Sequence, residues 1–254
     1  MTSNTFKRRL KAGETLIGLW AQSGHAAVSE VIADAGFDWL LIDGEHAPIE
    51  VPSIIDQLRV IEPSGTPAIV RPAWNDPVIL KRVLDTGVQT LLVPYVQSAD
   101  EARRAVAAAR YPPAGTRGVA ATIRANRYGR VTDYHARAND EVCVLVQLET
   151  REAVSRLEDI AAVDGVDGLF IGPSDLAASL GHLGHNAHPD VRALIADACQ
   201  RAHAVRTPIG ILATVEADAR ACLEMGFQYV AVGSDIGVLR QAADALLRKF
   251  RPPA

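Results

Sequence analysis

Two acidic residues stand at matching places in the chain, each behind a short apolar run. Glu149 follows residues 144–148, and Asp175 closes the stretch 168–175, which begins with apolar residues. Runs of this length are typical of buried parallel strands, and in a closed parallel barrel the residues past the strand ends face the active-site mouth. Two carboxylates from neighbouring strands predict a shared site for a hard divalent cation. Acids are also common where helices start, so helix capping is the alternative interpretation.

Further polar residues follow other predicted strands and indicate what such a cation would act on. Arg71 ends one strand, His46 follows another, and a Gly-Pro-Ser turn precedes Asp175. The set favours metal-assisted chemistry on a 2-oxo acid, with the metal on the substrate carboxylate and 2-oxo oxygen and Arg71 on the enolate oxygen. Backbone amides around Ser174 would hold the carboxylate. His46 would transfer the proton as general base or acid.

Several of these residues also have a plainer interpretation. Arg71 would serve as a structural ion-pair partner, His46 as a loop histidine and Asp43 as a turn residue. Glu45 is the poorer base, because an extended segment would point it away from the face that carries His46. Asp85 falls in a predicted helix, where a solvated surface position is the simplest interpretation.

Two further patterns narrow the chemistry. His182, His185 and His188 lack the helical spacing and the cysteine partners of known zinc motifs, so an exposed loop is predicted there. The lysines all lie on helical or terminal segments. A Schiff-base aldolase needs a lysine in its active site, so that enzyme class is disfavoured.

The elements that position these residues alternate between strand and helix. Eight short apolar runs separated by helical patterns predict parallel βαβ units that close as a (β/α)₈ barrel, here one domain over residues 1–254. An open doubly wound sheet is the alternative, but no G-x-G-x-x-G follows the first strand. The predicted strands are 16–20, 39–43, 68–72, 90–94, 144–148, 168–171, 208–212 and 229–233, and the predicted helices 26–35, 51–60, 77–86, 99–109, 131–139, 152–162, 189–206, 215–225 and 236–250.

Composition excludes several classes of partner. The chain has 254 residues, 48% of them hydrophobic, and a net charge of −4, which is ordinary for a globular protein and argues against a nucleic-acid surface. No apolar stretch reaches the roughly 18 residues of a membrane span, and no secretory signal is expected at the start. Cys143, Cys199 and Cys222 are far apart and odd in number, which favours reduced, buried thiols in a cytoplasmic protein.

Five segments together resemble one enzyme family over essentially the whole chain. The chain is similar to the class II, metal-dependent pyruvate aldolases of the HpcH/HpaI family, which includes the 4-hydroxy-2-oxoheptane-1,7-dioate aldolases. Any one of the segments alone would be unspecific, but the combination is highly specific. They are residues 36–48, 70–77, 110–118, 147–151 and 170–176.

This resemblance implies an activity and assigns roles. The expected reaction is reversible aldol cleavage of 4-hydroxy-2-oxo acids to pyruvate, or a related 2-oxo acid such as hydroxypyruvate, and an aldehyde, with Mg²⁺, Mn²⁺ or Co²⁺. Glu149 and Asp175 would ligate the metal, and Arg71 would hold the 2-oxo oxygen. His46 would transfer a proton, oriented by Asp85, a role that replaces the plain interpretation of that aspartate.

The resemblance also implies an assembly and a substrate-binding set. The barrel would pack its last helix on a neighbouring subunit in a homohexamer built as a trimer of dimers. The residues that would line the substrate site are Gln147, Gly172, Pro173, Ser174 and Asp175 on the pyruvate side, with Trp20 and Leu212 nearer the aldehyde.

Two other functions remain as alternatives. A citryl- or malyl-CoA lyase of the same superfamily would need a basic groove for the CoA phosphates, which the acidic balance disfavours. A non-catalytic barrel would have no use for the full set of polar residues at the strand ends.

Overall fold

Eight parallel strands form a closed barrel in which each strand pairs with its neighbours in sequence and β1 pairs with β8. The computed structural model describes residues 3–251. The predicted (β/α)₈ barrel is therefore confirmed, and the open doubly wound sheet is excluded. The strands are β1 Leu16–Ala21, β2 Trp39–Asp43, β3 Ala68–Arg71, β4 Thr90–Val93, β5 Cys143–Leu148, β6 Gly168–Ile171, β7 Ile209–Leu212 and β8 Tyr229–Ser234.

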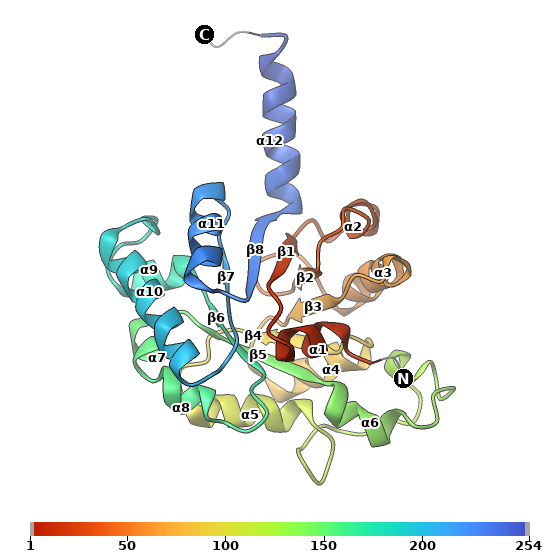
Figure 1. The fold of residues 1–254 in the computed structure, drawn as a ribbon. Helices are drawn as coiled ribbons and strands as arrows, with labels where there is room; N and C mark the ends of the chain where they lie inside the picture. The colour runs from red at the N-terminus through yellow and green to blue at the C-terminus, as the bar shows by residue number, and fades with distance from the viewer. Residues whose placement is uncertain (1–2, 252–254) are drawn as a thin grey trace.

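Most of the helices surround the barrel in an outer ring, whereas the first packs against the barrel interior and the last projects away (Figure 1). The helices are α1 Thr5–Lys11, α2 Ala26–Ala33, α3 Val51–Ile61, α4 Pro77–Asp85, α5 Ala99–Ala109, α6 Tyr134–Glu141, α7 Arg151–Ser155, α8 Leu157–Ala161, α9 Pro173–Ser179, α10 Pro189–Ala204, α11 Glu216–Met225 and α12 Asp235–Arg248, with short 3₁₀ turns η1 Glu62–Ser64 and η2 Arg124–Asn126.

The helices differ from the sequence prediction at three places in the chain. The helix predicted over 152–162 divides into α7 and α8, because Arg156 leaves the helical conformation with φ −107° and ψ 19°. The seven-residue α9 begins at Pro173, where proline suits the first helical turn. The additional helix α1 buries Phe6 and Leu10 against the barrel interior.

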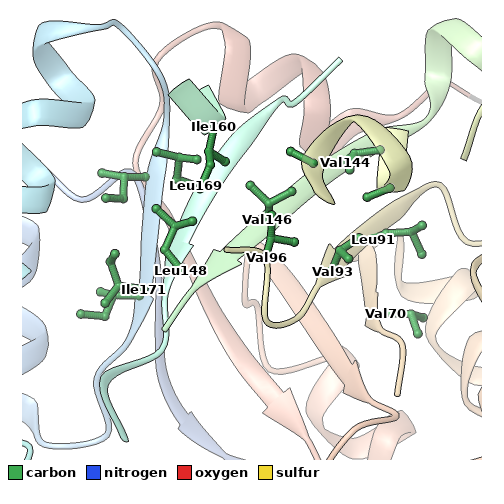
Figure 2. Close-up of a cluster of buried hydrophobic side chains, with 14 of the residues drawn as sticks. Val70, Leu91, Val93, Val96, Val144, Val146, Leu148, Ile160, Leu169 and Ile171 are labelled. Carbon is green, nitrogen blue, oxygen red and sulfur yellow. The ribbon is translucent and has the colours of Figure 1, made fainter. Parts of the chain in front are cut away.

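Successive residues of each strand point alternately outward and inward, so the barrel has two apolar layers. On β5, Val144, Val146 and Leu148 join the cluster between sheet and helices, which Figure 2 shows with Ile160 of α8. Cys143 and Leu145 of the same strand face the barrel interior. Gln147 continues that inward row toward the mouth of the barrel.

Aromatic rings fill much of the interior. Trp39 packs edge-on against Trp20, Phe6 and Tyr229, with ring centroids 6.1–6.3 Å apart. Gly18 makes room for this packing, since a Cβ there would lie 2.1 Å from the Trp39 ring. The interior is thus a packed core, and only the strand ends are open to a substrate.

The last helix, α12, leaves the barrel and projects away from it (Figure 1). It carries exposed apolar side chains along its length, and the described chain continues this pattern to Phe250. The exposed residues are Ile236, Val238, Leu239, Leu246, Leu247 and Phe250. Among residues 3–251, no helix is long and apolar enough to cross a membrane.

Candidate active site at the C-terminal ends of the strands

The inward-facing residues of β2 and β3 end in one acidic and one positively charged side chain, which lie side by side. Asp43 follows Trp39 and Leu41 on the inward face of β2, and Arg71 follows Ile69 on β3. The strand register pairs Asp43 with Arg71 directly. The alternation of the strands therefore delivers both side chains to the same end of the barrel.

Arg71 is held by a two-point ion pair. Its Nε and Nη2 donate to the two carboxylate oxygens of Asp43 at 2.9 and 2.7 Å, and the two side chains are 8% and 0% exposed. The guanidinium also lies over the ring of Trp20, 5.4 Å from the centroid. This arrangement fixes the plane of Arg71 and leaves Nη1 and the second N–H of Nη2 for another acceptor.

Glu45 faces Arg71, so the orientation expected for an extended segment is wrong, while the preference for His46 as the base stays a prediction. The segment after β2 turns sharply, because Asp43 Oδ1 accepts hydrogen bonds from the backbone N–H groups of Glu45 and His46. Glu45 Oε2 consequently lies 2.9 Å from Arg71 Nη1, although the two are not aligned as a hydrogen bond and this buried oxygen has no hydrogen-bond partner among residues 3–251.

Glu149 is buried just beyond β5, and each of its carboxylate oxygens accepts a hydrogen bond. Its Oε1 accepts the backbone N–H of Tyr95 at 2.7 Å, and its Oε2 accepts from Gln147 Nε2 at 2.9 Å. Thr150, not Glu149, caps the following helix, with its side chain accepting from the N–H of Ala153. The capping interpretation of Glu149 is therefore wrong.

Asp175 lies exposed in the first turn of α9, one position beyond the exposed Ser174, and it is not the residue that precedes the helix. The buried Gly172 brings this turn close to β5, since a Cβ there would lie 2.9 Å from both Glu149 Oε2 and Gln147 Nε2. Pro173 occupies the first helical position. The turn and the end of β5 thus form one wall of the site.

Among the described residues of the site, the carboxylates outnumber the one nearby cation, Arg71, and their pKa values show the effect. Burial, and then the charges of Glu45 and Asp175, raise the pKa of Glu149 to about 7. Burial is also the largest factor that raises the pKa of Glu45, against the opposing charge of Arg71. Burial works in the same direction on Asp43, but the hydrogen bonds and charge of Arg71 outweigh it and lower the pKa of Asp43.

Three other residues expected in the site occupy different depths. His46 is 59% exposed on the rim, with Nε2 3.7 Å from Glu45 Oε2. Trp20 is 1% exposed and donates from Nε1 to Asp43 Oδ2 at 3.2 Å, so it forms the floor under Arg71. Leu212 ends β7, partly buried against the inner cluster.

The structure does not bring Asp85 to His46 within one chain. α4 runs back from the mouth of the barrel, so Asp85 at its C-terminal end lies near the start of β4, at the opposite end of the strands. There its carboxylate accepts from Nη2 of the buried Arg117 at 2.8 Å. The plain solvated interpretation is also incomplete, because Asp85 is half of a partly buried ion pair.

Sequence reasoning undervalued Asp43, Glu45 and Tyr95. The inward row of β2 could have identified Asp43, since it falls two residues after Leu41. Glu45 and Tyr95 depend on turn geometry that no periodicity reports. Tyr95 has a left-handed backbone with φ 55°, which is unusual for a residue with a side chain, and its N–H is held by Glu149.

One family model and several known proteins are similar to this chain. The HpcH/HpaI aldolase/citrate lyase family model matches residues 16–242. A pyruvate aldolase of Rhizobium etli is 52% identical over 97% of each chain. A 4-hydroxy-2-oxo-heptane-1,7-dioate aldolase of Salmonella paratyphi B is 53% identical over 97% of this chain and 94% of its own.

A solved structure gives the same result for the fold. A HpcH/HpaI aldolase/citrate lyase family protein from Burkholderia cenocepacia superposes with a TM-score of 0.95 at 41% identity, over 98% of this chain and 100% of the other. Similarity of this extent covers the barrel and all the strand ends described above. The chain belongs to the HpcH/HpaI aldolase/citrate lyase family.

Proposed function

We propose that the protein is a metal-dependent aldolase that cleaves 4-hydroxy-2-oxo acids reversibly to pyruvate and an aldehyde. The relatives named pyruvate aldolase and 4-hydroxy-2-oxo-heptane-1,7-dioate aldolase support this reaction. The structural observation that carries it is the position of the buried Glu149, which accepts two hydrogen bonds and lies next to the turn of Asp175. The fixed guanidinium of Arg71 lies at the same end of the barrel. Hydroxypyruvate is a related 2-oxo acid that the same groups suit.

The residues at this end of the barrel fit a divalent cation held by Glu149 and Asp175. Burial, and then the charges of neighbouring carboxylates, raise the pKa of Glu149, and a bound cation would favour its ionised form against both. Within residues 3–251, the buried Gln147 Oε1 has no hydrogen-bond donor, so it is a further acceptor beside Glu149. Oxygen donors select Mg²⁺, Mn²⁺ or Co²⁺, and two protein carboxylates leave positions for water and substrate.

The bound cation would supply Lewis acidity at the carboxylate and 2-oxo oxygens of the substrate. The chain's own residues do the remainder. Arg71 donates its free N–H groups to the 2-oxo oxygen and stabilises negative charge there as the enolate forms. Gln147 and the turn of Gly172, Pro173 and Ser174 line the pyruvate side. Trp20 supports Arg71 from below, and Leu212 faces the aldehyde side.

His46 is the proposed proton carrier on the rim, where a 4-hydroxyl group would lie. It takes the hydroxyl proton in cleavage and returns it in condensation. Orientation of His46 by Asp85 is compatible with the fold only if a second copy of the chain provides that aspartate, because α4 carries it away from the site in its own chain.

We propose that the chain, one barrel over residues 1–254, assembles as a homohexamer in which α12 packs on a neighbouring subunit. The exposed apolar side chains of α12 support this, since a helix that projects from its own barrel leaves them in water. Three free, buried cysteines are compatible with a cytoplasmic enzyme. Light scattering should give the mass of six chains, and a monomer would contradict the assembly.

The test of the activity is a measurement of pyruvate released from a panel of 4-hydroxy-2-oxo acids. We expect release that chelator abolishes and Mg²⁺, Mn²⁺ or Co²⁺ restores. The family also includes citrate lyases, so citryl- and malyl-CoA are run in parallel as the second candidate. Thioester cleavage without pyruvate release would replace the aldolase assignment, and neither activity would favour a non-catalytic barrel.

A further inference from the structure

The loop between α9 and α10 carries histidines that the proposed aldolase chemistry does not use. As predicted, residues 182–188 are not helical, and the loop leads into α10. Within it, His182 and His188 stack face to face with ring centroids 3.5 Å apart and planes 16° apart. Asp190, in the first turn of α10, lies beside both rings. The fold thus joins residues whose sequence spacing alone did not indicate a metal site.

The potential ligand atoms lie close together, although the two stacked rings must rotate before their in-plane lone pairs can meet at one ion. His182 Nε2 lies 3.3 Å from Asp190 Oδ2, and His188 Nδ1 lies 3.7 Å from the same oxygen. Metal–ligand bonds of about 2.0–2.1 Å in a tetrahedral site put two ligand atoms roughly 3.3 Å apart. Among residues 3–251, this is the only group of three or more His, Cys, Asp or Glu residues whose ligand atoms all lie within 4.8 Å of one another.

A ligand set of two imidazoles and one carboxylate prefers a different metal ion from the one that the active-site carboxylates would bind. Imidazole nitrogen suits Zn²⁺, Cu²⁺ and Ni²⁺, whereas Mg²⁺ prefers oxygen in near-octahedral geometry. We propose that His182, His188 and Asp190 form a second metal site, which takes Zn²⁺ or a similar borderline ion and leaves one position to water. The site shares no residue with the carboxylate pair of the proposed aldolase centre.

Binding of an ion would replace one hydrogen bond of His188. His188 Nδ1 now accepts the backbone N–H of Asp190 at 3.2 Å and so caps α10. An ion takes over that lone pair, and the first turn of α10 must adjust. The helix N-terminus disfavours a cation, but the Asp190 carboxylate supplies compensating charge. The three side chains are 25%, 36% and 68% exposed, so an ion can reach them and the rings can rotate to bind it.

Equilibrium dialysis against Zn²⁺ in excess Mg²⁺ tests the proposal. The full chain carries Glu149→Gln and Asp175→Asn, which removes the proposed active-site ligands. We expect this parent to retain one Zn²⁺ per chain. Adding His182→Ala or His188→Ala should weaken binding by more than about tenfold, the lower end of the loss caused by outer-shell changes alone. His185→Ala, in the same exposed loop but outside the cluster, is the matched control and should leave binding unchanged.

A spectroscopic measurement on the wild-type chain and its single variants does not depend on the folding of the triple variant. Bound Cu²⁺ should show nitrogen hyperfine coupling in electron paramagnetic resonance, and His182→Ala should reduce it. Zn²⁺ binding that is unaffected by His182→Ala and His188→Ala would overturn the proposal. Equal weakening by His185→Ala, or copper coordinated by oxygen alone, would overturn it as well. Failure of this site would leave the aldolase assignment untouched, because the two share no ligand.

Discussion

Arg71 and Asp43 face each other from adjacent strands, and the guanidinium of Arg71 bonds both oxygens of the Asp43 carboxylate. Lysine keeps the charge but cannot make this two-point contact. We expect Arg71→Lys to fold and to bind Mg²⁺, while kcat/KM for pyruvate release falls by about 10²–10³-fold, the effect of losing one well-placed donor to a developing oxyanion. Arg82→Lys on the exposed face of α4 is the control. Unchanged turnover in Arg71→Lys would make Arg71 purely structural.

The same pair predicts a stability effect for its acidic member. Removing one partner of a buried ion pair leaves the other charge uncompensated and costs about 3–5 kcal/mol. Asp43→Asn retains an acceptor, so we expect a loss in the free energy of unfolding at or below that range in urea denaturation. Asp56→Asn is the matched control, because its pair with Arg59 is exposed on both sides. A similarly small loss in both variants would contradict the role of the buried pair.

The raised pKa of Glu149 predicts opposite pH effects on the metal-free and metal-bound protein. Its folded-state pKa of about 7 exceeds the ordinary value of 4.5, so the folded protein holds a proton that the unfolded chain releases. The stability of the metal-free protein should therefore fall as pH rises from 4.5 through about 7, by at most about 1.4 kcal/mol per pH unit from this group. Thermal unfolding of Glu149→Gln should lack that part of the slope.

The affinity for the metal ion should rise with pH over the same range in which the stability of the metal-free protein falls. A ligating carboxylate must be ionised, so the affinity for Mg²⁺ should weaken by about tenfold per pH unit below about pH 7 as Glu149 takes up its proton. Calorimetry in two buffers of different ionisation enthalpy measures the proton released. An affinity that does not change between pH 5.5 and 7.5 would exclude Glu149 as a ligand with this pKa.

His46→Ala tests the proton carrier on the rim. Loss of a general base typically lowers the rate by about 10²–10⁴-fold, so we expect kcat to fall by about this factor with a smaller change in KM. Pyruvate and metal should still bind, because Arg71, Glu149 and Asp175 remain. Wild-type kcat in this variant would identify His46 as an ordinary loop residue.

Asp85→Asn accompanies that experiment and separates two roles. If Asp85 of a second copy orients His46, its substitution lowers kcat in the same direction as His46→Ala but more weakly. If Asp85 serves only its own Arg117, thermal stability falls while kcat of the folded enzyme stays unchanged. Adding His46→Ala makes the distinction sharper, since a residue that acts through His46 has no further effect on kcat once His46 is gone.

Much of the fold is predictable because the apolar runs are short and regularly spaced. Val144 and Leu148 mark β5 by their place in such a run, and seven further runs alternating with helical patterns indicate a closed barrel despite the long connection between β4 and β5. The division between α7 and α8 is not predictable in this way, because the backbone angles at Arg156 determine it, whereas Pro173 is a sequence signal for the start of α9 that the apolar pattern alone does not use. α1 carries too short an apolar pattern to distinguish a helix from a terminal segment.

The candidate site is predictable where strand alternation places a residue, and less so where a turn does. Arg71 and Gln147 follow from the inward rows of β3 and β5. Glu45 does not, because its direction depends on two hydrogen bonds to Asp43 that form only after the turn folds. The proposed relation of Asp85 to His46 would require a second copy of the chain, because Asp85 pairs with Arg117 in its own chain.

The central claim is that Glu149, Asp175 and Arg71 form a metal-dependent centre for the enolate of pyruvate. Exchange of the pyruvate methyl protons with D₂O, followed by proton NMR, tests this without any aldehyde substrate. We predict rapid exchange with Mg²⁺, none after chelation, and none in Glu149→Gln under conditions where the exposed control Asp56→Asn exchanges normally. Exchange at the wild-type rate in chelator-treated protein, or in Glu149→Gln, would contradict the assignment of the site.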